Sequence, residues 1–272
     1  MVKVLVVTRT KDRSNLLPRA IESILNQSYK NWHHVIVNDG GNIDKFNSVI
    51  LKYERQYKNR LTVISNTSSV GMEKASNLGI ISTKSEYIAI HDDDDTWEQD
   101  FLKEMVNTIE LSSCDGSVCH VTQIFERTVG EHIEILDKRY FNPDLKKCNI
   151  SRLRLKNQFL PISFVFTRRA YLSLNGFDES FDVCGDWDFH YRFLQKYKIK
   201  VIRKRLANYH VRDINREDSN NINSIKNKAL HSKFRQKFLL KHNIKENSVF
   251  LQKIYDLTVL RCIRLIMRRM IK

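Results

Sequence analysis

Residues 87–97 have the sequence YIAIHDDDDTW, in which a short apolar run leads directly into four consecutive aspartates. The run from Tyr87 to Ile90 predicts a buried strand. Four adjacent like charges repel one another, and burying them unpaired is costly, so positive charge should lie beside them. Carboxylate oxygens suit Mg²⁺ or Mn²⁺, which proteins usually hold together with substrate phosphates. The stretch therefore predicts a divalent metal site at the end of a strand.

Asp92 and Asp94 form an Asp-x-Asp pair within this run. Residues two apart in an extended segment face the same way, so both carboxylates could reach one ion. The alternative is a solvated acidic turn before a helix that starts near Gln99, in which Asp95 or Thr96 serves only as a cap. The apolar strand before the aspartates favours the metal site.

The composition is that of one large domain, or of one domain with an appendage, in 272 residues. Five cysteines form neither a Cys-x-x-Cys motif nor a zinc spacing, which indicates reduced thiols in a cytoplasm. The apolar run at Val4–Val7 is too short for the core of a signal peptide, and no stretch approaches a transmembrane span. We therefore expect a cytoplasmic protein.

The net charge of +15 is concentrated near the end of the sequence. Residues 222–272 hold 13 lysines and arginines but only Glu246 and Asp256 as acids, so this segment carries +11. We expect a catalytic domain over residues 1–221 and a basic amphipathic helical tail over 222–272. Within the domain, residues 1–112 should form a nucleotide-binding half and 113–221 an acceptor half.

The tail has apolar residues at helical spacing, beside a stripe of basic ones. The apolar positions are Phe250, Ile254, Leu257, Leu260, Ile263, Met267 and Met270. A helix of this kind can lie on an anionic membrane surface, which would place the protein at the inner face of a membrane. The alternative is that the stripe packs onto the domain or onto a sister subunit in a homo-oligomer. The sequence does not favour nucleic-acid binding, because no known nucleic-acid-binding motif accompanies the charge.

Strand-like and helix-like segments alternate through the first 97 residues. Apolar strand segments are Lys3–Val7, Trp32–Val37, Leu61–Ile64 and Tyr87–Ile90, and the helical segments between them are Leu16–Gln27, Lys45–Tyr57 and Glu73–Ile81. This βαβαβαβ order predicts a parallel, doubly wound α/β sheet with helices on both faces.

Polar residues follow these strands where they end. Arg9 and Arg13 follow the first, Asp39 the second, and Asp92 and Asp94 the fourth. In an open α/β sheet such residues gather along one edge and form a crevice for a ligand such as a nucleotide. The glycine-rich fingerprints of dinucleotide-binding folds and P-loop ATPases are absent from the sequence.

Taken in order, these motifs resemble glycosyltransferase family 2. They are the loop after Thr8, Asp39-Gly40, the segment GMEKASNLG at 71–79, and the four aspartates. The resemblance covers about residues 2–212. It implies the GT-A fold, a Rossmann-like, mixed and mainly parallel sheet, here with a C-terminal helical extension.

The resemblance also implies roles for single residues. Asp39 would contact the nucleotide base, Asp92 the ribose and Asp94 the metal. The full donor-binding set is Thr8, Arg13, Asp39, Lys74, Asn77, Asp92 and Asp93. The family often has an arginine where this sequence has Ser76, and Lys74 is the candidate for the missing charge. Helix packing is the alternative role for Asn77.

A second signature covers residues 175–193, with the sequence NGFDESFDVCGDWDFHYRF. It resembles the family's Gly-Phe-Asp-Glu followed by an acidic pair, which appears here as Gly185-Asp186, without the first acid. The resemblance implies that Asp186 is the catalytic base. Independently, an aspartate at a helix N-terminus is stabilised as an anion, and desolvation can raise its pKa to a useful value.

Three of four further residues, Trp187, Asp188 and His210, have two interpretations each. Trp187 could stack on an acceptor sugar or belong to the core. Asp188, a rival base and acceptor contact, could instead bond to backbone amides at the helix start. The resemblance implies a metal or diphosphate contact for His210 and a phosphate contact for Arg212, whereas a lone histidine is more often structural.

Together these inferences predict an inverting glycosyltransferase that uses Mn²⁺ or Mg²⁺. The donor would be a nucleoside-diphosphate sugar, most simply a UDP-sugar. The acceptor would be a hydroxyl of a glycan or lipid-linked molecule, as in the synthesis of a surface polysaccharide or lipopolysaccharide. One alternative is a sugar-phosphate nucleotidyltransferase, although residues 8–13 lack that class's glycine-rich loop. Another is a non-catalytic basic adaptor for membrane or nucleic acid, which the retained aspartates argue against.

Overall fold

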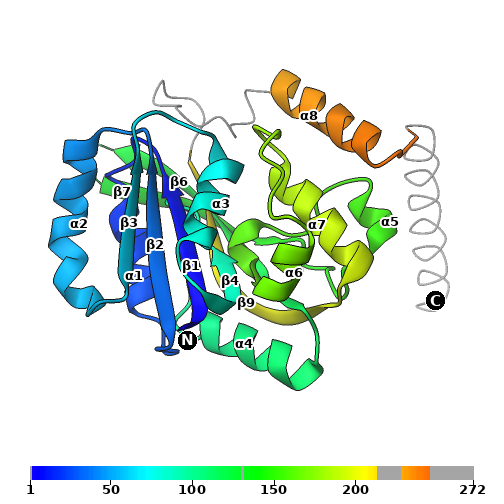
Figure 1. Cartoon of the computed structure of the whole chain (residues 1–272), viewed down its shortest axis with the longest axis horizontal. Helices are drawn as coiled ribbons and strands as arrows, with labels where there is room; N and C mark the ends of the chain where they lie inside the picture. The colour runs from blue at the N-terminus through cyan, green and yellow to red at the C-terminus, as the bar shows by residue number, and fades with distance from the viewer. Residues whose placement is uncertain (1, 130–131, 213–227, 246–272) are drawn as a thin grey trace, which may run out of the picture.

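A computed structural model of the chain describes residues 2–129, 132–212 and 228–245 (Figure 1). The apolar stripe predicted for Phe250 to Met270 lies outside these residues. The strands are β1 Val2–Thr10, β2 Trp32–Asp39, β3 Leu61–Asn66, β4 Ser85–Ile90, β5 Thr96–Trp97, β6 Gly116–Val129, β7 His132–Phe141, β8 Phe164–Thr167 and β9 Ile199–Arg212. The helices are α1 Leu17–Leu25, α2 Ile43–Tyr57, α3 Met72–Ile81, α4 Phe101–Ser112, α5 Ile150–Leu153, the 3₁₀ helix η1 Pro161–Ser163, α6 Arg168–Ser173, α7 Gly185–Lys196 and α8 Lys228–Lys241.

The described strands form one sheet in the order β3-β2-β1-β4-β8-β6-β9-β5, with β7 paired to β6. Strands β1 to β4 are parallel to one another, as the alternation of strands and helices predicts. Beyond β4 the sheet is mixed, because β8 is antiparallel to both β4 and β6 whereas β6 and β9 are parallel. The carboxyl ends of β1, β2 and β4 therefore meet at one edge, where the polar motifs begin.

Helices cover both faces of this sheet. On one face, apolar side chains of α1, α2 and α4 pack on the strands, including Ile21, Phe46 and Met105. On the other, α3, α6 and α7 supply a second core that includes Ala75 and Phe193. Because the central strands are covered on both sides, they are continuously apolar rather than alternating.

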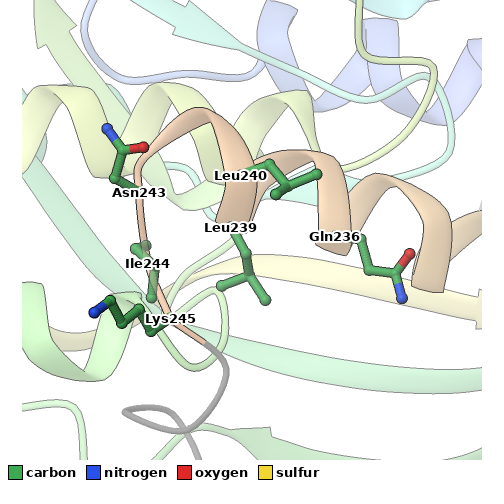
Figure 2. A pocket seen from close by; sticks show the side chains of 6 residues that line it. All are labelled: Gln236, Leu239, Leu240, Asn243, Ile244 and Lys245. Carbon is green, nitrogen blue, oxygen red and sulfur yellow. The ribbon is translucent and has the colours of Figure 1, made fainter.

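The helix α8 packs against α7 (Figure 1). Trp187 stacks on Phe238 with ring centroids 4.4 Å apart, and Tyr191 meets the same phenylalanine edge-on. A surface pocket of about 530 Å³ lies at the C-terminal end of α8. Figure 2 shows the side chains that line it, which are Gln236, Leu239, Leu240, Asn243, Ile244 and Lys245. Among the described residues, no helix is both long and apolar enough to span a membrane.

The middle of the chain differs most from the sequence-based expectation. The polar stretch after Phe125 contains strand β7, which forms an antiparallel hairpin with β6 around a bulge at Phe125 and Glu126. The strand expected at Ile199–Ile202 continues to Arg212, because β9 runs along the whole of β6 with two register shifts. Their exposed or half-buried polar side chains hide both strands from a search for apolar runs.

Candidate active site

Asp39 ends β2 and organises the loop that precedes α3. Its carboxylate accepts hydrogen bonds from Asn66 Nδ2 (2.8 Å), Ser69 Oγ (2.7 Å) and the backbone N–H groups of Val70 (2.9 Å) and Gly71 (3.1 Å). Burial opposes its ionisation, but these four donors outweigh burial and lower the pKa of Asp39. The aspartate is therefore a fixed anion at the sheet edge.

Three of the four consecutive aspartates pair with arginines from other elements. Asp92 Oδ1 accepts from Arg9 Nη2 at 2.9 Å. Asp93 accepts from Arg13 at 2.8 Å. Asp94 Oδ2 lies 3.2 Å from Arg13 Nη1 and 2.5 Å from Arg212 Nη2. The predicted positive charge is thus present, and it comes from the protein itself at the ends of β1 and β9.

The four carboxyls differ in proton affinity. Burial raises the pKa of Asp93 to about 6 despite the charge of Arg13. Burial also opposes ionisation of Asp94, but the charges of Arg13 and Arg212 outweigh it and lower the pKa of that carboxyl. Asp94 is consequently the most firmly ionised member of the Asp-x-Asp pair, since the pKa of Asp92 is raised by burial.

Asp95 has a structural position. It is buried, and its Oδ1 accepts a hydrogen bond from the backbone N–H of His210 at 2.8 Å, which ties the aspartate run to β9. The cap at Asp95 or Thr96, which was the alternative to a metal site, is not formed, because α4 begins at Phe101 with Asp100 at its N-cap position.

His210 has partners at both ring nitrogens. Its Nδ1 lies 2.8 Å from Glu126 Oε2 and its Nε2 3.1 Å from Thr96 Oγ1. Glu126 is buried and also binds Arg19, whose other guanidinium nitrogen donates to the backbone carbonyl of Asp94. Glu126 thus orients the imidazole so that Nδ1 donates to the carboxylate and Nε2 remains the nitrogen available to accept.

The side chains that could coordinate a metal fit a divalent ion only in part. No group of three or more histidine, cysteine or acidic side chains among the described residues is arranged to hold a metal. Asp94 supplies an ionised carboxylate, and Asp92, with its side chain 26% exposed, is accessible beside it. His210 would have to release Thr96 to become a ligand. The arrangement suits an ion held by one or two carboxylates plus ligand phosphates.

Asp186 lies in the first turn of α7, where the helix dipole favours an anion. Asn157 Nδ2 donates to its Oδ2 at 2.7 Å, and His190 Nδ1 lies 3.0 Å from Asn157 Oδ1. Burial lowers the pKa of His190 to about 3, so the ring is neutral and its Nδ1–H can fix the orientation of the Asn157 amide. Burial raises the pKa of Asp186 to about 6, against the hydrogen bond from Trp187 N–H and the charge of Arg9.

Helix α3 presents Ser76 to the site. The Ser76 hydroxyl accepts a hydrogen bond of 2.7 Å from Arg9 Nη1, while the other end of the same guanidinium binds Asp92. Arg9, rather than Lys74, is therefore the cation beside Ser76. Lys74 is exposed on α3.

Several predicted residues lie in structural positions. Asn77 binds Phe177 N–H and carbonyl, Tyr171 and Glu179, so it joins α3 to the segment before α7. Thr8 is fully buried, and its hydroxyl lies 2.9 Å from His34 Nε2. The contacts of Asn77 suit the packing role that was its alternative interpretation. Because Thr8 is fully buried, its side chain has no access to a ligand.

The structure also places Trp187 and Asp188 in the interior. Trp187 is 6% exposed, stacks on Phe238 and donates its indole N–H to Leu153 O at 2.5 Å. Asp188 is fully buried and bonds to Arg192, Lys241 and His242. Both side chains hold α8 against α7, a position that speaks against the acceptor contacts expected of them.

Three site residues escaped the sequence-based inference: Arg19, Glu126 and Asn157. The sequence signal for Arg19 is a cation in the first turn of a strongly amphipathic helix. Glu126 was hidden at the start of a stretch with no clear periodicity. Asn157 lies in a loop between α5 and η1, where no pattern in the sequence marks it.

Comparison with known sequences identifies relatives along most of the chain. The sequence profile of "Glycosyl transferase family 2" matches residues 4–173. An uncharacterized glycosyltransferase of Bacillus subtilis, YwdF, is 24% identical over 74% of this chain and 71% of its own length. An uncharacterized glycosyltransferase of Methanocaldococcus jannaschii is 26% identical over 92% of this chain and 82% of its own length.

Solved structures with the same fold include two that hold nucleotide sugars. TarS residues 1–349 from S. aureus, in complex with UDP-GlcNAc, superpose with a TM-score of 0.63 at 17% identity. The match covers 78% of this chain but 59% of that one. The mannosyltransferase PcManGT from Pyrobaculum calidifontis, in complex with GDP-Man and Mn²⁺, gives 0.59 at 16% identity, covering 76% and 56%. At these identities the likeness establishes the fold.

Proposed function

The chain belongs to glycosyl transferase family 2 and has the GT-A fold, and from that premise we propose that it is an inverting glycosyltransferase. It would transfer a sugar from a nucleoside-diphosphate sugar to a hydroxyl of a glycan or lipid-linked acceptor. A UDP-sugar is the proposed donor, since TarS in the solved complexes holds UDP and UDP-GlcNAc. The synthesis of a cell-surface polysaccharide is the proposed setting.

One observation carries this proposal: Asp186 and the strand-end aspartates act on the same arginine. Burial opposes the positive charge of Arg9, but the nearby carboxyl groups of Asp92, Glu73 and Asp186 outweigh burial and raise its pKa. Arg9, Asp92 and Asp186 come from β1, the end of β4 and the start of α7, so the proposed base and a proposed phosphate-binding arginine belong to one centre. Transfer of a sugar from a diphosphate requires both.

The arginines would bind the donor diphosphate. Arg9, Arg13 and Arg212 already point at the aspartates of the strand end. Guanidinium groups bind phosphate oxygens with two parallel hydrogen bonds, so a diphosphate arriving here would share these cations with the carboxylates. Asp39, as a fixed anion at the end of β2, would accept hydrogen bonds from the nucleotide base at the far end of the donor.

A Mn²⁺ or Mg²⁺ ion would be held by the carboxylates of Asp94 and Asp92 together with the phosphates of the nucleotide sugar. Such an ion would neutralise the charge that develops on the leaving diphosphate. His210, oriented by Glu126, lies next to this position and is the candidate to join it if Thr96 is displaced.

Asp186 would act as the base. With a pKa raised to about 6, it is largely ionised near pH 7 yet has enough proton affinity to accept a proton. The acceptor hydroxyl would give its proton to Asp186 while its oxygen attacks the anomeric carbon from the face opposite the leaving diphosphate. Asn157 holds the carboxylate in place through the 2.7 Å hydrogen bond.

Membrane association is proposed through the basic tail, because a lipid-linked acceptor would be presented at an anionic surface. Co-sedimentation with vesicles of anionic and of neutral lipid tests this directly. Binding to anionic vesicles that weakens with salt supports it, and equal recovery in the supernatant with both lipids contradicts it.

The function itself is tested by incubating the protein with a panel of nucleoside-diphosphate sugars and Mn²⁺, and measuring the nucleoside diphosphate released with and without candidate glycan acceptors. Release from one donor that increases with acceptor supports the proposal. Pyrophosphate release from a nucleoside triphosphate and a sugar phosphate, without turnover of any nucleotide sugar, would instead identify a nucleotidyltransferase.

A further inference from the structure

Glu73 is a carboxyl group that the proposed mechanism does not use. It lies in the first turn of α3 and is 4% exposed. Its Oε2 is buried and finds no hydrogen-bond partner among the described residues. A buried carboxyl oxygen without a partner costs free energy, so the presence of Glu73 calls for a functional explanation.

The side chain of Glu73 lies directly against the backbone of Gly185. A Cβ atom at position 185 would fall 2.3 Å from Glu73 Oε1 and 2.5 Å from both Cδ and Cγ, closer than real side chains approach. The φ angle of Gly185 is not in the left-handed region, so the backbone there does not require glycine. Gly185 therefore makes room for Glu73, and the Glu73 carboxyl takes the space of a side chain at the position next to Asp186.

We propose that Glu73 is a positioning residue for Asp186. In this proposal Glu73 and Asp186 form an acidic pair, and the Glu73 carboxyl reaches from α3 into the space that a side chain at position 185 would occupy. This inference rests on the proposed function, because Asp186 is its base. It also links two features of the sequence: a glycine just before Asp186 and a glutamate in the first turn of α3.

The charges around Glu73 come from three elements. They are Arg9 of β1, Asp92 after β4, and Asp186 and Asp188 of α7. The Cys184 thiol, just before α7, is a further titratable group that interacts with Glu73. Burial raises the pKa of Glu73 to about 8, Arg9 works against this, and Asp186, Asp92 and Asp188 add to it. The pKa of Asp186 is about 6, so near pH 7 Glu73 holds a proton while Asp186 is ionised.

A neutral Glu73 has a consequence for donor binding. Because it adds no negative charge, Arg9 keeps its positive charge available for Asp92 and for a diphosphate. During transfer, the acceptor proton would move to Asp186 and the proton on Glu73 would stay in place. Above its pKa, Glu73 would become a second anion beside Asp186 and would compete with the diphosphate for Arg9.

The first test compares the pH dependence of kcat/KM for the donor in the wild type and in Glu73→Gln, which keeps the shape of the side chain but cannot ionise. We expect the wild-type value to fall as pH rises through about 8 and that fall to be absent from Glu73→Gln. If kcat/KM falls in the same way at alkaline pH in both proteins, the inference is overturned. A Glu73 with a purely structural role would not affect the alkaline part of the pH profile.

The second test moves the carboxyl across the contact. Glu73→Ala and Gly185→Asp are each expected to lower kcat at least tenfold, the first by removing the carboxyl and the second by crowding it. Combined, they restore one carboxyl in the shared space, so kcat should recover to within about threefold of the wild type. If the fold-loss in kcat of the double variant equals the product of the fold-losses of the two single variants, the pairing of Glu73 with Asp186 is overturned, provided that the unfolding midpoint of the double variant matches that of the wild type.

A third measurement does not depend on turnover. The infrared spectrum of the wild type at pH 7 should contain a protonated-carboxyl band that is missing from Glu73→Gln, and its absence from the wild type overturns the inference. Failure of this inference is thus distinguishable from failure of the proposed function. If the wild type turns over a nucleotide sugar but the infrared and pH results are unchanged by Glu73→Gln, only the role of Glu73 is wrong.

Discussion

Asn157 Nδ2 donates a hydrogen bond of 2.7 Å to Asp186 Oδ2, and this contact joins a loop without regular structure to the first turn of α7. The amide of Asn157 is itself fixed by the neutral His190, which is stacked on Phe159 with ring centroids 4.0 Å apart. Asp186 therefore has one orientation, held by a chain of side chains that ends in the core. Such support from the core keeps a base in position for proton transfer.

Replacing Asp186 by asparagine should remove transfer while leaving donor binding nearly intact. A positioned general base contributes roughly 100- to 10,000-fold to a rate, so kcat should fall by an amount in that range. Nucleotide affinity should change by less than about twofold, which calorimetric titration measures. Asp182→Asn, an exposed aspartate in the preceding loop, is the matched control. Loss of nucleotide binding in Asp186→Asn would count against its role as base.

Asn157→Leu should shift the acid limb of the kcat profile to higher pH. The hydrogen bond from Asn157 favours the ionised form of Asp186 and so lowers its pKa. Without that bond the pKa of Asp186 rises above about 6, and the base form is lost at a higher pH. At pH 6.5 the rate should fall by about tenfold, in line with the loss of one hydrogen bond to a charged group. An acid limb at the wild-type position would show that Asn157 does not act on Asp186.

Asp39→Asn should weaken nucleotide binding by about tenfold, because the variant loses the charge that holds four donors of the loop before α3. Titration with the nucleotide diphosphate measures the affinity, and backbone amide exchange at Val70 and Gly71 reports on the loop. Asp44→Asn on the exposed first turn of α2 is the control. Unchanged affinity together with faster exchange would assign Asp39 a purely structural role.

Trp187 should contribute to stability rather than to acceptor affinity. Trp187→Ala removes a buried indole that stacks on Phe238, and a loss of about 3–5 kcal/mol in unfolding free energy is expected. Urea denaturation measures this value. Trp187→Phe keeps most of the packing and should leave the acceptor KM unchanged. A stable Trp187→Ala with a raised acceptor KM would restore the interpretation as an acceptor contact.

Asp188→Ala should destabilise the packing of α8 on α7. It leaves Arg192 and His242 without their buried partner, which typically costs about 3–5 kcal/mol. Lys204→Ala, which breaks the exposed pair with Glu104, should cost at most about 1 kcal/mol and serves as the control.

The effect of Asp188 should also depend on pH. Burial opposes ionisation of Asp188, but the hydrogen bond from His242 and the charge of Arg192 outweigh it and lower its pKa. A depressed pKa contributes stability above the unfolded value of about 3.9, and that stability is lost as pH falls through the lower folded value. The stability gap between wild type and Asp188→Ala should therefore narrow below about pH 4. A gap that is constant down to pH 2 would contradict the ion-pair explanation.

The predicted fold class is confirmed, and its physical basis is local. Continuous apolar strands such as Val4–Val7 and apolar helix faces such as that of α1 identify a doubly wound sheet, because each pattern depends on neighbours in the sequence. Strand β7 was missed because every side chain of it except Phe141 is exposed.

The candidate site was predictable only where a motif marks it. Asp39, Asp92, Asp94 and Asp186 stand at element ends, where the sequence pattern predicts function. Glu73 could not be found in this way, since an acidic residue in the first turn of a helix normally caps it in solvent. Its burial depends on Gly185, more than 100 residues later, and only the folded chain shows that contact.

The central claim is that the edge formed by β1, β2 and β4 binds a nucleoside diphosphate with a divalent ion. Calorimetric titration of UDP, GDP and TDP, each with Mn²⁺ and again with EDTA, tests it most directly. We predict metal-dependent binding of one nucleotide, UDP, with little or none in EDTA. No binding of any nucleotide under either condition, by a protein that unfolds cooperatively, would contradict the account and favour a non-catalytic adaptor built on a transferase fold.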